Sequence, residues 1–139
     1  MKMKRWILAA VLAVCATAWA ADELSLSMGW TYNKSDRKRS LPPATETYDI
    51  SGPGVLENVQ SIGTTAEGLA IGEVTNAGFF YAHNLGTNNI HVGVTTGGLF
   101  VAFGKLGADE AGSFFLSTTG VWARATTAAT LLEYVIADR

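Results

Sequence analysis

The chain has 139 residues, of which 48% are apolar and 16% charged, with two histidines and one cysteine. A formal net charge of −2 argues against general nucleic-acid binding, which needs a basic patch that neutralises several phosphates. A single cysteine cannot form a disulfide within the chain or a cysteine-ligated zinc site.

Residues 1–20 have the pattern of a secretory signal peptide. A basic start is followed by an apolar run over 7–14 and a small-x-small end at 18–20. The run is shorter than the roughly 20 residues that a membrane-spanning helix needs. We expect cleavage before Ala21 and export to the periplasm or the extracellular space. A mis-assigned start codon ahead of a cytoplasmic protein is the alternative.

Removal of residues 1–20 takes away three of the ten basic residues and none of the twelve acidic ones, which leaves a net charge of −5. Cys15, the only cysteine, is removed as well, so the mature chain has no thiolate nucleophile. We expect residues 21–139 to form one domain with a single core and no contact with the membrane after cleavage.

The first elements in chain order are two strands and a basic segment between them. Alternation of apolar and polar residues predicts a strand over 24–32. The following NKSDRKRSLPP clusters four basic residues before Pro42-Pro43, and prolines do not fit a central strand. We predict a solvated loop or hairpin tip there, with a basic recognition patch as the alternative. A strand over Ala44–Ile50 follows, and SGPG ends it as a turn.

Further strands are predicted where short apolar or alternating runs lie between turn-forming residues. They are VLENVQSI, the short strand or extended link EGLAIGEV, AGFFYAHN, NIHVGVT, GGLFVAFGK, SFFLST, GVWARA and ATLLEYVIA. GGLFVAFGK is apolar enough to be covered on both faces, and GADEAG is predicted to form a turn. No stretch of the mature chain has helical periodicity.

Eight to ten short strands with regularly spaced turns predict an all-β fold. We expect a single-domain antiparallel β-sandwich, jelly-roll-like, over residues 21–139. An outer-membrane β-barrel is the alternative for an exported all-β chain. It needs strands of roughly ten residues and a lipid-facing apolar band, whereas the predicted strands are mostly shorter and show no aromatic girdle.

Both histidines, His83 and His91, flank a stretch of turn-forming asparagines. A β-hairpin with the loop Leu85–Asn88 explains these asparagines without a ligand. The paired residues are then Asn84 with Asn89, His83 with Ile90, and Ala82 with His91. Because cross-strand partners share a sheet face, the two histidines then point to opposite faces. Two histidines without a third ligand make a poor metal site, so we expect no metal.

The sequence shows no established catalytic motif. A Gly-x-Ser-x-Gly elbow is absent, and VGVTTGG lacks the lysine and helix of a phosphate loop. The pair Asp109-Glu110 is predicted to solvate a Gly-rich turn rather than to serve glycosidase chemistry. Glu133, between Leu132 and Tyr134, is predicted to be satisfied or exposed. We therefore expect no catalytic residue and no cofactor.

Aromatic residues supply the remaining candidates for contact with a partner. Trp30, Tyr48, Tyr81 and Trp122 are of the kind that builds a sugar-stacking platform, although aromatics in a small sandwich are more often core. With Tyr134 of the last predicted strand, they form the set of possible interface or ligand contacts.

Five segments carry a resemblance to a known class of protein. They are ELSLSMGWTYNK, ENVQSIGTTAEGLAIGEV, GFFYAHNLGTNNIHVGV, FGKLGADEAGSFFL and VWARATTAATLLEYVIADR. In these segments, which cover nearly the whole mature chain in the same order, the chain resembles small β-sandwich proteins encoded among the virion genes of tailed phages and prophages. The resemblance implies a non-catalytic virion or virion-assembly component and supplies no catalytic residues.

The expected function is that of a non-enzymatic structural subunit that binds copies of itself or a neighbouring subunit, with the virion as an alternative location. A secreted module that binds a glycan or another extracellular ligand is the second hypothesis. A hydrolase that uses His83 or His91 with a carboxylate is the third. The run Thr130–Ile136 is apolar on both faces, so we expect it to be central in its sheet with its second face under a loop, or to lie in a subunit interface.

Overall fold

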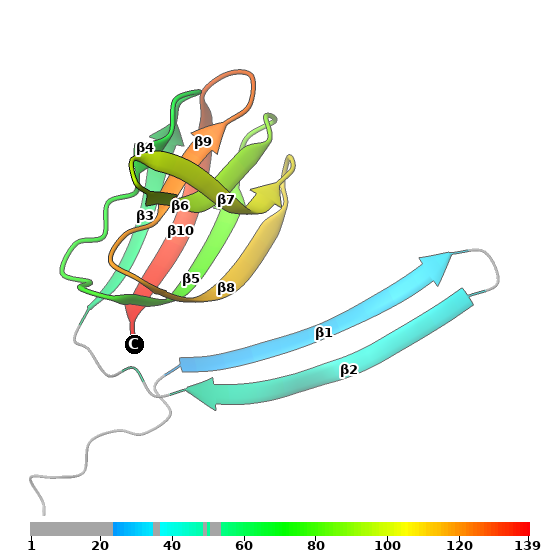
Figure 1. The fold of residues 1–139 in the computed structure, drawn as a ribbon. Helices are drawn as coiled ribbons and strands as arrows, with labels where there is room; N and C mark the ends of the chain where they lie inside the picture. Colours follow the sequence, from blue (N-terminus) through cyan, green and yellow to red (C-terminus); the bar gives the residue numbers. More distant parts are fainter. Residues whose placement is uncertain (1–23, 35–36, 49, 51–53) are drawn as a thin grey trace, which may run out of the picture. The chain divides into compact units, whose positions relative to one another are not determined.

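The computed structural model describes residues 24–34, 37–48, 50 and 54–139, apart from the side chain of Trp30. These residues form ten strands and no helix, and within them no helical segment has the length and apolar character to cross a bilayer. The predicted signal peptide, with Cys15, lies outside the described residues. The chain divides into two compact units, Met1–Asp49 and Ile50–Arg139 (Figure 1). The expected single domain over 21–139 stays a prediction.

The first unit is a two-stranded antiparallel ribbon of β1 (Leu24–Lys34) and β2 (Arg37–Tyr48). Paired residues share a face, and alternate residues change face. One face therefore carries the large apolar side chains together with Glu46 and, at one end, Lys34, Arg37 and Arg39, and the other carries serines, threonines, an asparagine and Lys38. The apolar face includes Leu26, Met28, Tyr32, Leu41 and Ala44, and a hollow on it is lined by four of these together with Gly29, Pro42 and Glu46.

The structure corrects the predicted loop before Ala44. Strand β2 begins at Arg37 and runs through Pro42 and Pro43. Both strands of a two-stranded ribbon have a free edge, and a proline at a free edge removes no ladder hydrogen bond. The pairing register also shifts between Met28 and Trp30, which gives the two prolines room beside Gly29.

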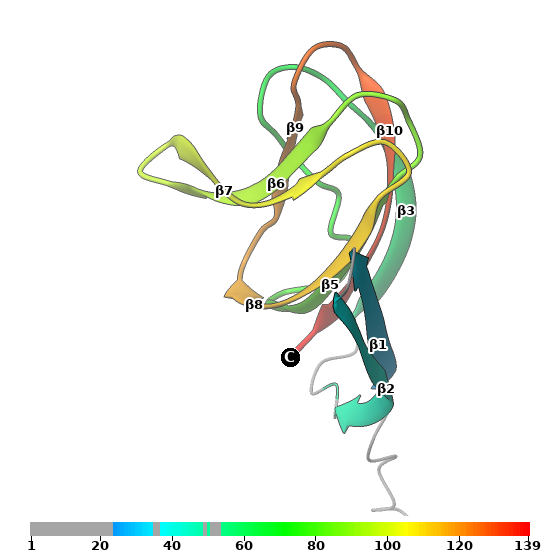
Figure 2. The ribbon, with the colours of Figure 1, turned by 90° about the vertical axis from the view of Figure 1, so that its right-hand side faces the viewer.

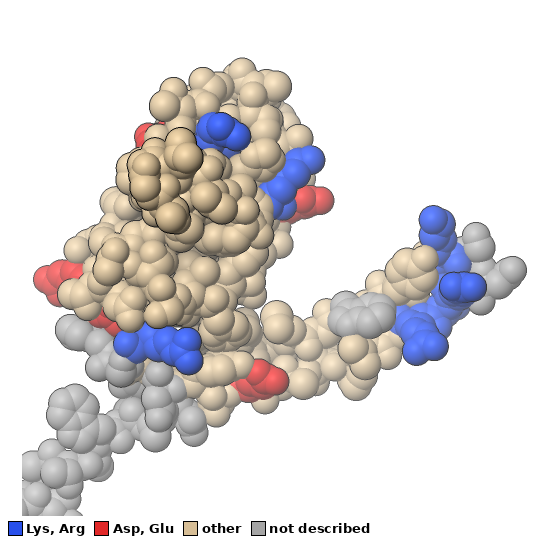
Figure 3. Space-filling view, viewed as in Figure 1, with Lys and Arg blue, Asp and Glu red and all other residues tan. Residues whose placement is uncertain are grey.

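The basic residues of this segment lie at the end of the ribbon where β1 leads into β2. Lys34 is paired with Arg37, and Lys38 and Arg39 follow in β2. Figure 3 shows these cations gathered at that end. The ribbon is therefore amphipathic across its two faces and basic at one end.

The second unit is a β-sandwich of two four-stranded antiparallel sheets (Figures 1 and 2). The first sheet has the order β3 (Val55–Ile62), β10 (Thr130–Asp138), β5 (Ala77–Asn84) and β8 (Ala111–Thr118). The second has the order β4 (Glu67–Gly68), β9 (Trp122–Ala125), β6 (Ile90–Thr96) and β7 (Leu99–Leu106). The predicted all-β sandwich is confirmed.

Consecutive strands of the sandwich alternate between the two sheets, in a jelly-roll-like manner, at every connection but one. The exception is the β6–β7 hairpin, whose turn residues Gly97 and Gly98 both have positive φ, 58° and 79°. This conformation suits a two-residue hairpin turn and favours glycine. The predicted hairpin around Leu85–Asn88 is wrong, because β5 and β6 belong to different sheets.

Alternate residues of both sheets meet in one hydrophobic core. The largest fully buried side chains include Tyr134, Phe80, Ile62, Ile90 and Leu132. Phe80 lies near Phe103, Phe114 and Tyr134, with ring centroids 6.0–6.5 Å apart. Residues that alternate with these core positions face outward from one sheet or the other.

Strand β10 lies between β3 and β5 in the first sheet, as predicted for a central position. Its inward residues Leu132, Tyr134 and Ile136 are fully buried, whereas the outward Leu131 is 48% exposed. The outward face at Leu131 is therefore not covered within the described chain. Of the two arrangements expected for this strand, a subunit interface is the one that an exposed Leu131 favours.

Strand β7 departs from its prediction, because it was expected to be covered on both faces. It is the edge strand of the second sheet, and Leu99, Val101 and Phe103 are all exposed, Leu99 at 73%. Leu99 and Val101 pair with Thr96 and Val94, which share the face of the buried Val92. The apolar residues of β7 therefore face the core side at an edge that the opposite sheet does not fully cover.

Candidate functional site

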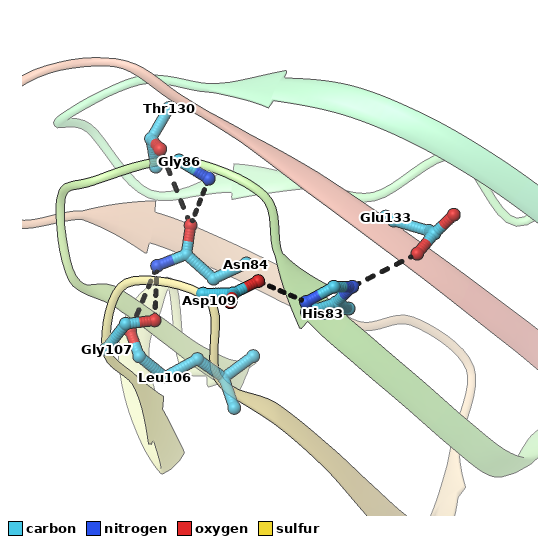
Figure 4. A network of polar contacts seen from close by, with 8 residues as sticks. All are labelled: His83, Asn84, Gly86, Leu106, Gly107, Asp109, Thr130 and Glu133. Atoms are coloured by element: carbon cyan, nitrogen blue, oxygen red, sulfur yellow. Dashed lines mark hydrogen bonds and ion pairs between the residues drawn. The ribbon is translucent and has the colours of Figure 1, made fainter.

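The buried Asn84 at the end of β5 connects three chain segments that cross between the sheets (Figure 4). Its side-chain Nδ2 donates to the carbonyl oxygens of Asn88 at 2.8 Å, Gly107 at 2.7 Å and Leu106 at 3.3 Å. Its Oδ1 accepts from the Gly86 N–H at 3.1 Å and from the Thr130 hydroxyl at 3.5 Å. The β5–β6, β7–β8 and β9–β10 connections therefore meet at one amide.

An asparagine suits this position because its amide supplies both donors and acceptor lone pairs. The Asn84 backbone is also used: its N–H donates to the Glu110 carbonyl, and its carbonyl accepts from the Asp109 N–H. A Cβ on Gly86 would lie 1.7 Å from the Thr130 hydroxyl oxygen, so only glycine fits there. The asparagines around the loop were predicted to be turn formers, but the role of Asn84 as a buried connector was missed.

His83, the residue before Asn84, faces outward and lies between two carboxylates. Its Nε2 is 3.2 Å from Asp109 Oδ1, and its Nδ1 is 3.3 Å from Glu133 Oε2. Glu133 lies on the neighbouring β10, while Asp109 lies in the β7–β8 turn with a positive φ of 57°. The side chain of His83 is 25% exposed and that of Asp109 is 92% exposed. Glu133 was predicted to be satisfied or exposed, and it contacts His83.

This arrangement is better suited to holding elements together than to proton transfer. Both ring nitrogens of His83 are occupied by carboxylates, whereas a general base needs a free nitrogen directed at its substrate. A protonated ring can donate to both carboxylates at once. The contacts join β5, β10 and the β7–β8 turn, and they are only partly buried. We interpret the His83 cluster as a clamp at the same end of the sandwich as Asn84.

His91 lies apart from this cluster, on β6 of the second sheet. It pairs with Lys105 and Arg124 and alternates with the buried Ile90 and Val92, so it faces outward from that sheet. The predicted pairing of Ala82 with His91 is wrong. The two histidines still point to opposite sides, because they lie on the outer faces of two different sheets. Among the described residues, no group of three or more potential ligands is placed to hold a metal ion.

A second polar centre closes the other end of β10. The carboxylate of Asp138, a residue only 4% exposed, accepts from the backbone N–H groups of Gly54, Thr75 and Asn76 at 2.8–3.0 Å. These hydrogen bonds, above all that from Asn76, hold the pKa of Asp138 below its ordinary value despite its burial. Asp138 thus fixes the segments that precede β3 and β5.

Of the five aromatic residues predicted as possible contacts, the three in the sandwich, Tyr81, Trp122 and Tyr134, do not lie side by side on one surface. The prediction for Tyr134 is corrected, because this residue is fully buried and its hydroxyl interacts with Asn58, Gln60 and the Ala70 carbonyl. Burial raises its pKa. Tyr81 and Trp122 are half-buried on the outer faces of different sheets. Tyr48, in the ribbon, donates a hydrogen bond to Glu46, and this bond raises the pKa of Tyr48. The side chain of Trp30 lies outside the described residues.

The outer face of the first sheet is the larger candidate surface. Its register places Val59, Glu133 and His83 in one row across the strands, and Glu57, Val135 and Tyr81 in the next. The exposed apolar residues on this face are Val55 at 60%, Val59 at 50%, Phe115 at 49% and Leu131 at 48%. We call this surface, which also includes Val135 and Tyr81, the apolar outer face. Only part of this face, the second face of the run Thr130–Ile136, is predicted from the sequence.

Comparison with known proteins adds no relative: no family model matches the chain, and no significant match is found to a curated protein or a solved structure. The class that the structure defines is therefore that of its fold, an antiparallel β-sandwich with a separate two-stranded ribbon.

Proposed function

We propose that this protein is a non-enzymatic structural subunit that assembles with copies of itself, in the manner of a small virion component of a tailed phage. The observation that carries the proposal is the exposure of large apolar side chains on regular β-structure. The apolar face of the ribbon and the apolar outer face of the first sheet each present several of them. Clusters of exposed apolar side chains of this kind mark protein–protein interaction sites.

The internal construction of the sandwich supports the same proposal. Asn84, His83 and Asp138 are occupied by contacts that fix loops and strand ends, so they serve rigidity. A rigid module with apolar outer surfaces suits symmetric assembly, in which each copy uses the same patches. The virion-like character rests on the resemblance of the five segments named above. Export by the signal peptide stays a prediction, with the virion as the alternative location.

The secreted glycan-binding module is less favoured by the geometry. A stacking platform needs aromatic side chains side by side on one surface. Tyr81 and Trp122 lie on opposite outer faces of the sandwich, and Tyr134 is buried in its core. This placement supports an assembly surface over a sugar platform.

The proposal is tested by light scattering during size-exclusion chromatography of the isolated protein, with its N-terminus determined by mass spectrometry. The 139 residues have a mass of 14.7 kDa. We expect particles of at least two copies whose fraction grows with concentration. A strict monomer at the highest soluble concentration would contradict the proposal.

A further inference from the structure

We propose that the apolar face of the β1–β2 ribbon of one copy lies on the apolar outer face of the first sheet of a second copy. This inference rests on the proposed function and names the two surfaces through which the copies assemble. The ribbon is the inserted element, and β3, β10 and β5 form the receiving surface.

The ribbon supplies the first reason. An isolated two-stranded hairpin is marginally stable at best in water, and it needs a further layer against its apolar face. Leu41 is 54% exposed and Met28 is 58% exposed on that face, whereas the opposite face carries serines, threonines, an asparagine and Lys38. Because the two faces differ so clearly, the ribbon has one side that suits contact with protein and one that suits water.

The receiving surface matches the ribbon in chemistry. Val59 and Leu131 lie on neighbouring strands, since Val59 pairs with Glu133 and Leu131 with Ser61. Both are about half exposed, although β10 is a central strand of the sheet. A central strand of an antiparallel sandwich normally has one face in the core and one polar, solvated face. The apolar Leu131 and Val135 on the outer face of β10 therefore favour a further layer of protein there.

Charge favours the same pair of surfaces. Residues 24–48 carry four basic and two acidic residues, whereas residues 54–139 carry three basic and seven acidic residues. Two of the acidic residues, Glu57 and Glu133, lie on the apolar outer face. Asp109 and Glu110 come directly before β8, the edge strand of the same sheet. The basic end of the ribbon therefore meets a surface of opposite sign, which favours this occupant over another acidic module.

The contact area is sufficient for a stable assembly. With 11 residues in β1, the ribbon is roughly 36 Å long and 10 Å wide, so one face covers roughly 360 Å². Two such contacts, exchanged between two copies, bury roughly 1,400 Å² counted over both partners, within the range of specific interfaces. A reciprocal exchange also satisfies two-fold symmetry.

Cross-linking tests the inference directly, in the full chain with Cys15→Ser as background. One preparation carries Leu41→Cys and the other carries Leu131→Cys, and the mixture is treated with a flexible bismaleimide. We expect a covalent heterodimer as the main product. The matched controls are Thr45→Cys, on the polar face of the ribbon, and Thr95→Cys, on the outer face of the second sheet. Pairs that include either control should give background cross-linking only.

Substitution gives an independent readout. Leu41→Asp removes the burial of one leucine, so it should weaken self-association by roughly tenfold or more. Leu131→Asp should do the same, and both variants should keep an all-β circular dichroism spectrum and a cooperative thermal transition. Thr45→Asp should leave association unchanged.

Each result decides between distinct possibilities. Oligomers that tolerate Leu41→Asp, or that give no heterodimer, would overturn the inference while the proposed function stands. A chain with both cysteines that forms only an internal link would show that the ribbon lies on its own sandwich, which also overturns the inference. A strict monomer in light scattering would instead contradict the proposed function itself.

Discussion

Asn84 shows how one buried amide can organise an entire end of a β-sandwich. The chain changes sheet at six of seven connections in the second unit, and three of these crossings meet at this residue. Each crossing leaves backbone carbonyls without ladder partners, and buried polar groups need hydrogen bonds. The Asn84 side chain bonds to several of them at once and so joins the three crossings.

Replacement of Asn84 by alanine is expected to lower the free energy of unfolding by about 3 kcal/mol or more. The substitution removes a partner from the carbonyls of Asn88, Leu106 and Gly107 and from the Gly86 N–H, and of these the Gly107 carbonyl keeps the Glu110 N–H as a donor. Each buried group left without a partner costs about 1–3 kcal/mol. Chemical denaturation monitored by circular dichroism measures the change. Asn88→Ala is the matched control, because its side chain accepts only from the exposed Thr127. Equal stability of the two variants would show that the Asn84 network contributes little.

Asp138 makes the stability of the sandwich depend on pH. The pKa of the Asp138 carboxyl is lower in the folded protein than in the unfolded chain, where it is roughly 4. The contribution of Asp138 to stability is therefore complete above roughly pH 4 and is lost as the pH falls through the pKa of the folded protein. We expect the Tm to fall below roughly pH 4 more steeply in the parent than in Asp138→Asn. At neutral pH, the variant should have the lower Tm. Calorimetric scans over a pH series test this, and parallel curves would contradict it.

At the scale of elements, β10 is the strand whose removal should be most damaging. It pairs with β3 on one side and β5 on the other, and it supplies Leu132, Tyr134 and Ile136 to the core. Burial of each large side chain is worth roughly 1.5–3 kcal/mol, whereas a domain is stable by only about 5–15 kcal/mol.

Deletion of residues 130–139 is therefore expected to give an insoluble or unfolded chain. Deletion of the exposed Arg139 alone is the control and should leave a cooperative thermal transition near that of the parent. Soluble yield and circular dichroism provide the measurements. A transition of the longer deletion within a few degrees of the parent would place β10 at the periphery and contradict the described core.

Much of the element pattern could be predicted, because strand alternation is a local property. The run VLENVQSI becomes β3 with the predicted bounds, and AGFFYAHN likewise becomes β5. Strand pairing is not a local property. The turn residues between β5 and β6 therefore predict a hairpin, although the two strands lie in different sheets. The Asn84 network could not be predicted for the same reason, since its partners come from three connections distant in sequence. The prolines of β2 favour a loop in the sequence, because a proline does not reveal whether its strand has a free edge.

At the scale of the whole molecule, the distribution of charge should control how fast copies meet. Basic residues gather in the ribbon, and acidic residues prevail in the sandwich. Salt shortens the Debye length from about 8 Å at physiological ionic strength to about 3 Å at 1 M. We expect the association rate constant to fall with added salt, while the dissociation rate, set by the apolar contact, changes little. Stopped-flow mixing of labelled copies measures both, and a salt-independent association rate would contradict this role of charge.

The measurement that tests the account most directly is sedimentation velocity of the parent, Leu41→Asp and Thr45→Asp over a wide concentration range. The two substitutions add the same charge to opposite faces of one strand, so they separate the effect of the apolar face from that of charge. We predict that the parent and Thr45→Asp form the same oligomer and that Leu41→Asp sediments as a monomer at concentrations where they assemble. Identical sedimentation of all three, whether as monomers or as oligomers, would contradict assembly through the apolar face of the ribbon.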